Sequence, residues 1–298
     1  MPNKTKSIQQ MTLPQWEKAF PDEDACDAYL VTHRWPSGKV KCPRCGSERV
    51  YELKTRKWHW ECPDCRTGGA YRFSDITGTI FENTNKDLRD WFRVIHLMLT
   101  GKKGISALQV QRQLGFGSYR TAWYMCHRVR AGLANEEFRK LMGIVEVDET
   151  YIGGDDGNRH LDKKKGNKGK TIVIGAVERK GNVVARVIDR ADHYDMEQFI
   201  HMVCGDKVSL LATDEHRAYA SLKDTFPHGQ VTHSKRQYVV GAIHTNTIEG
   251  FWSLFKRSIV GSFHQVSRKY LPLYIAEAQF RYNNRHNPDI FGAAIAGL

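Results

Sequence analysis

Hydrophobic positions between Lys86 and Leu133 repeat with the period of a helix. The first part of this stretch predicts one buried helix face, formed by Trp91, Val94, Ile95, Leu97 and Met98. The words "GISALQVQRQLGFGSYRTAWYMCHRVR" then predict a helix, a short turn that contains glycine, and a second helix. Ser106 and Ser118 stand where the N-caps of these two helices are expected. The stretch is therefore expected to be a helical block.

The second half of the chain is dominated by short apolar runs typical of strands. Ile144–Val147 is one such run and leads into Asp148, while Val208–Ala212 is another and leads to Asp214. Between them, "TIVIGAVERKGNVVARVIDRAD" predicts a hairpin that turns at Lys180–Gly181, and "DMEQFIHMVCG" predicts an amphipathic helix. The pattern indicates an α/β domain in which two aspartates stand at the carboxyl ends of strands. Carboxylates are the hard ligands that Mg²⁺ and Mn²⁺ prefer.

Four cysteines have the spacing of a metal site. "CPRC" and "CPDC" form the pattern C-x2-C-x16-C-x2-C, with the candidate ligands Cys42, Cys45, Cys62 and Cys65. Two such knuckles surround one Zn²⁺ tetrahedrally, and four protein ligands leave no open position for water, so the ion is structural. The intervening "RVYELKTRKWHWE" predicts two short strands around a basic turn, as in a zinc ribbon. The alternative, two disulfides of a secreted protein, is disfavoured because the N-terminus lacks the apolar core of a signal peptide.

The charge of the chain points to a polyanionic partner. The 298 residues contain 45 Lys and Arg against 33 Asp and Glu, which gives a net charge of +12. Nucleic acid is the first candidate partner and an anionic membrane surface the second. No apolar run approaches the roughly 18 residues that a membrane span needs. We therefore expect a cytoplasmic protein in a reducing compartment, where cysteines are thiols or metal ligands.

Two basic segments are candidate DNA contacts. The second helix of the helical block carries Arg120, Arg128 and Arg130 beside aromatic residues, which is typical of the recognition helix of a helix-turn-helix. The alternative is an ordinary helical hairpin with a solvated basic face. The loop near residues 153–170 contributes Lys163, Lys164 and Lys165. This loop either grips the DNA backbone or is simply a solvated, flexible insertion.

The composition divides the chain into four regions. We expect an α+β multidomain chain with a helical lead-in over residues 1–35, a zinc ribbon over 36–80, a helix-turn-helix-like region over 81–140 and a domain of strands and amphipathic segments over 141–298.

The stretch "HTNTIEGFWSLFKR" carries one acid on an amphipathic helix. Its apolar stripe is formed by Ile248, Phe251, Trp252, Phe255 and Ile259, whereas Glu249, Ser253 and Lys256 lie on another face. Taken alone, Glu249 has two interpretations. It is either a member of a catalytic site, or the N3 residue of a capping box that begins at Asn246.

The local words of the chain resemble one known family. "VDETYIGG", "TDEHRAY", "HTNTIEGFWSLFKR" and "YNNRHN", together with the cysteine quartet, resemble insertion-sequence transposases with an N-terminal zinc ribbon and an ISXO2-like catalytic domain. Asp148, Asp214 and Glu249 match the Asp-Asp-Glu triad, with 34 residues between the last two. The resemblance implies a ribonuclease-H-like fold. That fold has a mixed sheet of five strands flanked by helices, with the three acids converging at one edge.

The resemblance also implies a mechanism and its residues. Two Mg²⁺ or Mn²⁺ ions are expected, with Asp148 bridging them, Asp214 on one ion and Glu249 on the other. Some relatives carry Asn as the third ligand, so Asn246 is a rival of Glu249. Lys256 is expected to contact a DNA phosphate. His244 has either a supporting role at the metal edge or a structural one.

The implied partner is double-stranded DNA, both the terminal inverted repeats of the transposon and the target. A homodimer or larger assembly on the bacterial nucleoid is expected, and no membrane. Two alternatives remain at this stage. One is a DNA-binding regulator with an inactive nuclease fold, and the other is a structure-selective nuclease.

Overall fold

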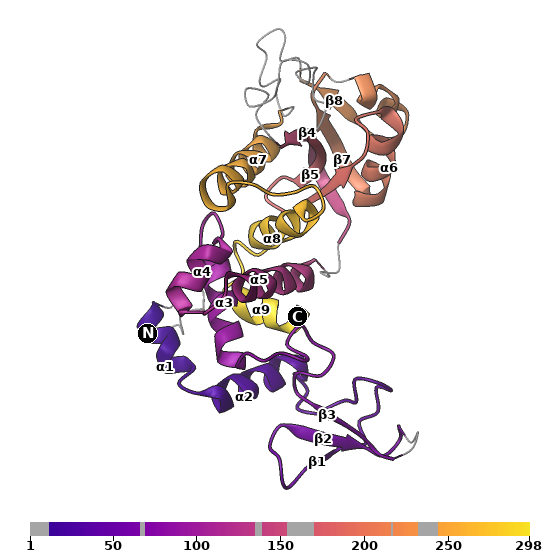
Figure 1. The fold of residues 1–298 in the computed structure, drawn as a ribbon. Coiled ribbons are helices and arrows are strands. Elements are labelled where there is room, and N and C mark those ends of the chain that lie inside the picture. Colours follow the sequence, from indigo (N-terminus) through magenta and orange to yellow (C-terminus); the bar gives the residue numbers. More distant parts are fainter. Residues whose placement is uncertain (1–11, 66–68, 135–138, 154–169, 216, 232–243) are drawn as a thin grey trace, which may run out of the picture. The chain divides into compact units, whose positions relative to one another are not determined.

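Two compact units divide the chain. The structure, a computed structural model, describes residues 12–65, 69–134, 139–153, 170–215, 217–231 and 244–298. Unit 1 comprises Met1–Asn135 together with Asn287–Leu298, and unit 2 comprises Glu136–His286 (Figure 1). The expected catalytic domain, 141–298, is therefore too long at its C-terminal end. Its last residues pack with unit 1 because they form an apolar helix that completes the core of that unit.

Unit 1 is built mainly of helices. Its described helices are α1 (Leu13–Ala19), α2 (Glu23–Arg34), α3 (Leu88–Thr100), α4 (Ala107–Leu114), α5 (Tyr119–Leu133) and α9 (Ile290–Gly297). The core is aromatic: the ring centroid of Phe92 lies 5.3 Å from that of Phe291 and 5.4 Å from that of Phe20. Both contacts are T-shaped, an arrangement that aromatic pairs prefer. Helix α9 thus closes a core that includes Phe20, about 270 residues earlier in the chain.

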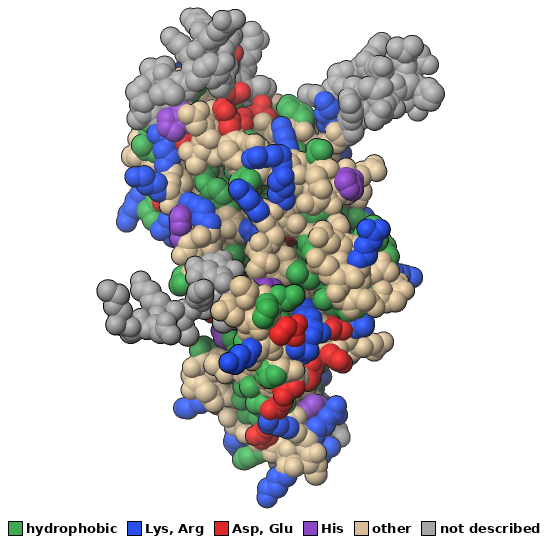
Figure 2. Space-filling view, turned by 90° about the vertical axis from the view of Figure 1, so that its left-hand side faces the viewer, with side chains coloured by type: hydrophobic (Ala, Val, Ile, Leu, Met, Phe, Trp, Pro, Cys, Tyr) green, Lys and Arg blue, Asp and Glu red, His purple; other side chains and the backbone are tan. Residues whose placement is uncertain are grey.

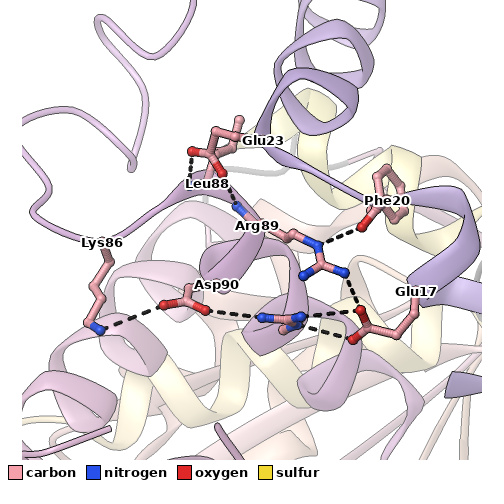
Figure 3. A network of polar contacts seen from close by, with 8 residues as sticks. Glu17, Phe20, Glu23, Lys86, Leu88, Arg89 and Asp90 are labelled. Atoms are coloured by element: carbon pink, nitrogen blue, oxygen red, sulfur yellow. Dashed lines mark hydrogen bonds and ion pairs between the residues drawn. The ribbon is translucent and has the colours of Figure 1, made fainter. Parts of the chain in front are cut away.

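A polar network joins α1 and α2 to the start of α3 (Figure 3). The carboxylate of Glu23 accepts hydrogen bonds from the main-chain amides of Leu88 and Arg89, which α3 would otherwise leave without partners. The Nε of Arg89 donates to the carbonyl of Phe20 at 2.6 Å. The carboxylate of Glu17 accepts hydrogen bonds from the guanidinium groups of both Arg89 and Arg93. An acid supplied by α2 therefore serves as the N-terminal cap of α3.

The expected zinc ribbon is present as a small antiparallel sheet. Within the described residues its strands are β1 (Tyr51–Glu52), β2 (His59–Cys62) and β3 (Tyr71–Ser74), in the order β1-β2-β3. Trp35, Trp60 and Phe73 form its hydrophobic core together with Cys42 and Cys62. Because this hydrophobic core is so small, we expect a structural metal to contribute strongly to the folding of the ribbon.

In the described part of unit 2, five strands form one mixed sheet. They are β4 (Leu141–Ile152), β5 (Thr171–Glu178), β6 (Val183–Ile188), β7 (Cys204–Thr213) and β8 (His228–Gln230), in the order β6-β5-β4-β7-β8. β4 pairs antiparallel with β5 and parallel with β7. The hairpin between β5 and β6 turns at Lys180–Gly181, where Lys180 has a φ of 61°. The ribonuclease-H-like sheet and its hairpin are confirmed.

Helices cover both faces of this sheet (Figure 1). On one face lie α6 (His193–Val203) and the 3₁₀ helix η4 (Arg217–Asp224), packed on a core that includes Val145 and Val147. On the other face lie α7 (Asn246–Ser258), the π-helical turn η6 (Ile259–Phe263) and α8 (Leu271–Asn283). Because side chains alternate along β4, its odd-numbered residues face α6 and its even-numbered residues face α7.

Helix α8 supplies hydrogen-bond partners to β6, one of the two edge strands of the described sheet. The side-chain amide of Asn283 accepts from the Val183 amide at 2.7 Å and donates to the Val183 carbonyl at 3.1 Å. Gln279 accepts from the Ala185 amide at 3.0 Å. These contacts satisfy main-chain groups that an open edge would expose to another chain.

Within the described ranges, no helix has both the length and the apolar character needed to cross a membrane.

Candidate active site

The parallel pairing of β4 and β7 brings two aspartates together. Glu146 on β4 is the register partner of Ala212 on β7, so Asp148 and Asp214, each two residues further on, follow side by side. Asp214 comes directly after the last residue of β7, as predicted. Asp148 does not end its strand, because β4 continues to Ile152 and pairs with β5 throughout. The aspartates therefore meet at the point where β7 stops and β4 goes on.

A third acid, Glu149, joins them. Among the described residues, one oxygen each of Asp148, Glu149 and Asp214 lies within 4.8 Å of the others. From strand alternation alone, Glu149 is expected to have only a secondary role, because its side chain faces α6 and η4. There its Oε2 accepts a hydrogen bond of 2.8 Å from the buried hydroxyl of Tyr219. Asp214, however, follows the last residue of β7 and is no longer part of the sheet. Side chains from both faces of β4 can therefore approach it.

The acids repel one another. Burial, together with the charges of Glu149, Asp214 and Glu249, raises the pKa of Asp148 to about 7. Like charges this close favour the protonated form unless a cation neutralises them. In Figure 2 acidic side chains gather on the surface of unit 2, with Lys and Arg side chains below them in the view. A set of hard oxygen ligands with this charge fits a divalent cation such as Mg²⁺ or Mn²⁺.

Glu249 on α7 is not in this group of oxygens within 4.8 Å of one another, but its charge acts on Asp148. Its exposed side chain lies on the face of the helix away from the buried stripe of Ile248, Phe251, Trp252 and Phe255, as predicted. The capping box that was the alternative interpretation of Glu249, beginning at Asn246, is absent. The N-cap is Thr245, whose hydroxyl donates to Oε1 of Glu249 at 2.8 Å. Asn246 is the exposed first residue of the helix.

The two other residues expected to support catalysis lie apart from each other. Lys256 is exposed near the C-terminal end of α7. His244 turns instead to a buried acid of β4: its Nδ1 lies 3.2 Å from Oε1 of Glu146, an ion pair when the imidazole is protonated. The contact is close but lacks the alignment of a hydrogen bond. The pairing of His244 with Glu146 favours the structural interpretation of this histidine.

The four cysteines of the ribbon form a second candidate metal centre. The Sγ atoms of Cys42 and Cys65 are 3.8 Å apart, and those of Cys45 and Cys62 are 3.7 Å apart. Sulfurs placed 2.3 Å from one ion in a tetrahedron lie about 3.8 Å apart, so the spacing fits zinc. Gly46, with a φ of 73°, allows its amide to return to the Cys42 carbonyl at 2.8 Å and so closes the first knuckle.

Both centres fall within matches to known family models. Residues 140–283 match the model of the ISXO2-like transposase domain, and residues 21–74 match that of the transposase zinc-ribbon domain. Together the two matches span about two thirds of the chain. The chain belongs to this transposase family.

Two known proteins resemble this transposase. An uncharacterized protein in the transposable element ISH50 of Halobacterium salinarum is 28% identical over 284 residues, which cover 89% of this chain and 92% of that protein. A cryo-electron microscopy structure of a simian T-cell lymphotropic virus intasome, in complex with the PP2A regulatory subunit B56 gamma, matches at 14% identity. That match has a TM-score of 0.30 and covers 57% of this chain and 63% of that chain.

Unit 1 of the transposase contains the helix, turn and second helix predicted from the sequence, as α4 and α5. Ser106 caps α4 by accepting from the Gln109 amide, and Ser118 caps α5 by accepting from the Arg120 amide, each at 3.2 Å. Gly115 ends α4 in the left-handed conformation, with a φ of 68°. The first turns of α5 are open to solvent, with Tyr119 49% and Tyr124 55% exposed.

Of the three arginines expected to bind DNA, the structure exposes one fully. Arg120 is exposed at the N-terminal end of α5. Arg128 is half-buried, lies over the rings of Trp91 and Tyr124, and donates to the Glu82 carbonyl at 3.1 Å. The expectation for Arg130 is wrong: its side chain is 1% exposed, because the C-terminal half of α5 lies in the core of unit 1. The other expected DNA contacts, Lys163, Lys164 and Lys165, lie outside the described residues.

Proposed function

We propose that this transposase cleaves DNA at the ends of an insertion sequence and joins the released 3′-hydroxyl to a target. Two divalent ions, Mg²⁺ or Mn²⁺, would be held by Asp148, Asp214 and Glu249. The single observation that supports this proposal is that oxygens of Asp148, Glu149 and Asp214 lie within 4.8 Å of one another at the end of β7, inside the segment that matches the transposase domain. Glu249 is added to this pair of aspartates as part of the proposal.

The proposed roles follow from where each acid stands. Asp148, which lies within 4.8 Å of Asp214 and whose pKa is also raised by Glu249, is suited to be shared by both ions, and Asp214 and Glu249 would complete one ion each. When bound, such ions activate the attacking oxygen and stabilise the leaving oxygen of an in-line displacement. The chain itself supplies the fixed carboxylates, and the charge of the bound ions would displace the proton that burial and mutual repulsion otherwise favour on Asp148.

Glu149 is the competitor of Glu249 for the third position. It lies in the group of converging oxygens, but its side chain faces α6 and η4, where its Oε2 accepts from the Tyr219 hydroxyl. Glu249 stands on α7, which covers the other face of the sheet, the face of Asp148, and its charge raises the pKa of Asp148. We therefore propose Glu249 as the ligand, Glu149 as a residue that adjusts the charge of the site, and Asn246 as a neighbour without a ligand role.

The experiment is cleavage of a supercoiled plasmid by the purified chain in Mg²⁺ or Mn²⁺, followed by joining of a labelled 3′-hydroxyl end. Asp214→Asn and Glu249→Gln should each lower both reactions by at least 10³-fold, since loss of an essential group typically costs about this much or more. Glu149→Gln should retain measurable activity. Asp189→Asn, in which an acid 84% exposed is neutralised outside the site, is the matched control.

Two results would contradict the proposal. If the Asp214→Asn variant still joined the labelled 3′-hydroxyl end to the target, the three acids would not be the catalytic residues. Cleavage without joining by the unaltered chain would identify a nuclease rather than a complete transposase.

We further propose that the exposed start of α5 reads the transposon ends. A cavity of about 530 Å³ lies against this helix, with Lys86, Arg120 and Arg128 in its wall and no acid among the described residues that line it. Recognition helices contact base edges with their N-terminal residues. Arg120→Ala should weaken binding of terminal-repeat DNA at least fivefold. Arg268→Ala, on an exposed arginine paired with Asp189, should leave it unchanged.

Joining two transposon ends to one target requires more than one active site. We propose a dimer or larger assembly on DNA. Mass measurement of the chain with and without paired terminal-repeat DNA tests this, and a strictly monomeric complex that performs joining would contradict it.

A further inference from the structure

We infer that Glu146 is a positioning residue that fixes the start of α7, and with it Glu249, relative to Asp148. Glu146 is 0% exposed and lies two residues before Asp148 on the same face of β4. The inference rests on the proposed role of Glu249 as a metal ligand.

The carboxylate of Glu146 binds the first turn of α7 directly. Its Oε2 accepts the main-chain amides of Thr247 at 2.7 Å and of Ile248 at 3.1 Å. Its Oε1 accepts the hydroxyl of Thr247 at 2.9 Å. A helix begins with amides that lack partners within the helix, and a carboxylate at this end is also favoured by the helix dipole. An acid from the sheet therefore takes the place of a cap supplied by the helix itself.

The buried charge of Glu146 is balanced from a second direction. The Nε of Arg179, at the end of β5, donates to Oε1 at 2.6 Å. The same guanidinium donates through its NH2 nitrogen to the carbonyl of His244 at 3.0 Å. The imidazole of His244 lies 3.2 Å from Glu146. Arg179 and Glu146 together thus hold both the residue before the N-cap and the first turn of the helix.

These contacts place the third acid. Thr245, the N-cap, donates its hydroxyl to Glu249, so the side chain of Glu249 is oriented by the very turn that Glu146 holds. β4, in turn, carries Asp148 and has a paired strand on each side. One carboxylate on a central strand therefore links two of the proposed ligands, which come from segments a hundred residues apart. Partners of this kind typically change metal affinity about 10- to 100-fold when they are lost.

The test compares Mn²⁺ affinity, measured by calorimetry on the zinc-loaded full-length chain, with the rate of plasmid cleavage. Glu146→Gln should raise the Mn²⁺ dissociation constant about 10- to 100-fold and shift the half-maximal Mn²⁺ concentration for cleavage by the same factor. Thr247→Val, which removes one hydroxyl bond and keeps the shape, should shift both about threefold, and it serves as the readout if Glu146→Gln does not fold.

Glu277→Gln is the matched control. Glu277 is also a glutamate of unit 2, 1% exposed and paired with an arginine, Arg281, but both residues belong to α8. Its substitution should destabilise the fold to a similar degree and leave the Mn²⁺ dissociation constant within about twofold of the unaltered value.

The outcomes distinguish the positioning role of Glu146 from the metal-ligand role of Glu249. If Glu249→Gln weakens Mn²⁺ binding but Glu146→Gln and Thr247→Val behave like Glu277→Gln, the positioning role is overturned and the metal ligand stands. If Glu249→Gln leaves Mn²⁺ affinity and cleavage intact, the ligand assignment itself fails, and the positioning role fails with it. A shift in Mn²⁺ affinity confined to Glu249, Glu146 and Thr247 variants supports the inference.

Discussion

Gly175 is the position at which a single methyl group should disturb the active site from outside it. It lies on β5, opposite Asp148 in the strand register, and the indole of Trp252 on α7 covers it. A Cβ atom at this position would lie 2.6 Å from Cζ2 and 2.8 Å from Cη2 of Trp252, and 3.2 Å from Cδ1 of Ile248. Carbon atoms in contact prefer separations of about 3.5–4.0 Å.

The required displacement is about 1 Å, the difference between that preferred separation and 2.6 Å. Trp252 is 4% exposed and Ile248 is fully buried, so the ring cannot simply turn into solvent. The helix must move instead, and Glu249 moves with it. Extra methyl groups in a packed core cost about 1–3 kcal/mol of stability. A misplacement of about 1 Å at a reacting centre can cost about 10²-fold in rate.

We therefore expect Gly175→Ala to lower plasmid cleavage about 10²-fold while unit 2 stays folded by circular dichroism. Gly250→Ala is the control: it adds the same methyl group on α7 itself, where nothing lies within 4 Å, and it should leave cleavage unchanged and stability equal or slightly higher. Adding Trp252→Phe to Gly175→Ala should recover part of the rate, because the smaller ring leaves room. Cleavage by folded Gly175→Ala at the unaltered rate would refute the reasoning.

Three further predictions concern stability. Cys62→Ser should abolish zinc binding and open residues 36–80 to limited proteolysis while residues 170–215 stay protected, because the ribbon core is small; a protected ribbon without zinc would contradict this. Burial, followed by the charge of Asp75, raises the pKa of Asp27 to about 8. The folded state therefore binds this proton more tightly than the unfolded state, and stability should fall as the pH rises from about 4 to 8. Asp27→Asn should flatten that decline in thermal unfolding, and an unchanged slope would refute the cause. Asn283→Ala should cost about 1–3 kcal/mol in urea unfolding, since it leaves both main-chain groups of Val183 without their partner; a loss below about 0.5 kcal/mol would show that water replaces the amide.

Local patterns predicted the parts of the molecule that local geometry decides. The cysteine spacing was sufficient for the ribbon, because two knuckles need only a few residues each. Apolar runs that lead into an acid were sufficient to single out Asp148 and Asp214, and the resemblance implied that they converge. The parallel pairing of β4 with β7 places them side by side, although β4 continues past Asp148. The capping serines of α4 and α5 follow from the same short-range chemistry.

The remaining features depend on contacts between distant segments. Glu146 stands among apolar residues in "GIVEVDETY", and nothing nearby indicates that it binds the start of a helix a hundred residues later. Glu149 joins the acids only because β7 ends earlier than β4. In the sequence Arg130 belongs to a basic segment of a helix, but in the structure its side chain is buried in the core of unit 1. The periodicity of apolar and polar residues along the sequence cannot show which of these long-range contacts a side chain makes.

The return of α9 to unit 1 makes the catalytic unit an insertion within another unit. Residues 136–286 form one continuous segment, whereas unit 1 is assembled from two pieces that the segment separates. Phe291, 1% exposed, completes an aromatic core whose other members precede residue 93. Exchange of catalytic segments between related transposases therefore needs two crossover points, one near residue 135 and one near residue 287. A single-junction chimera would combine the closing helix of one parent with the core of the other.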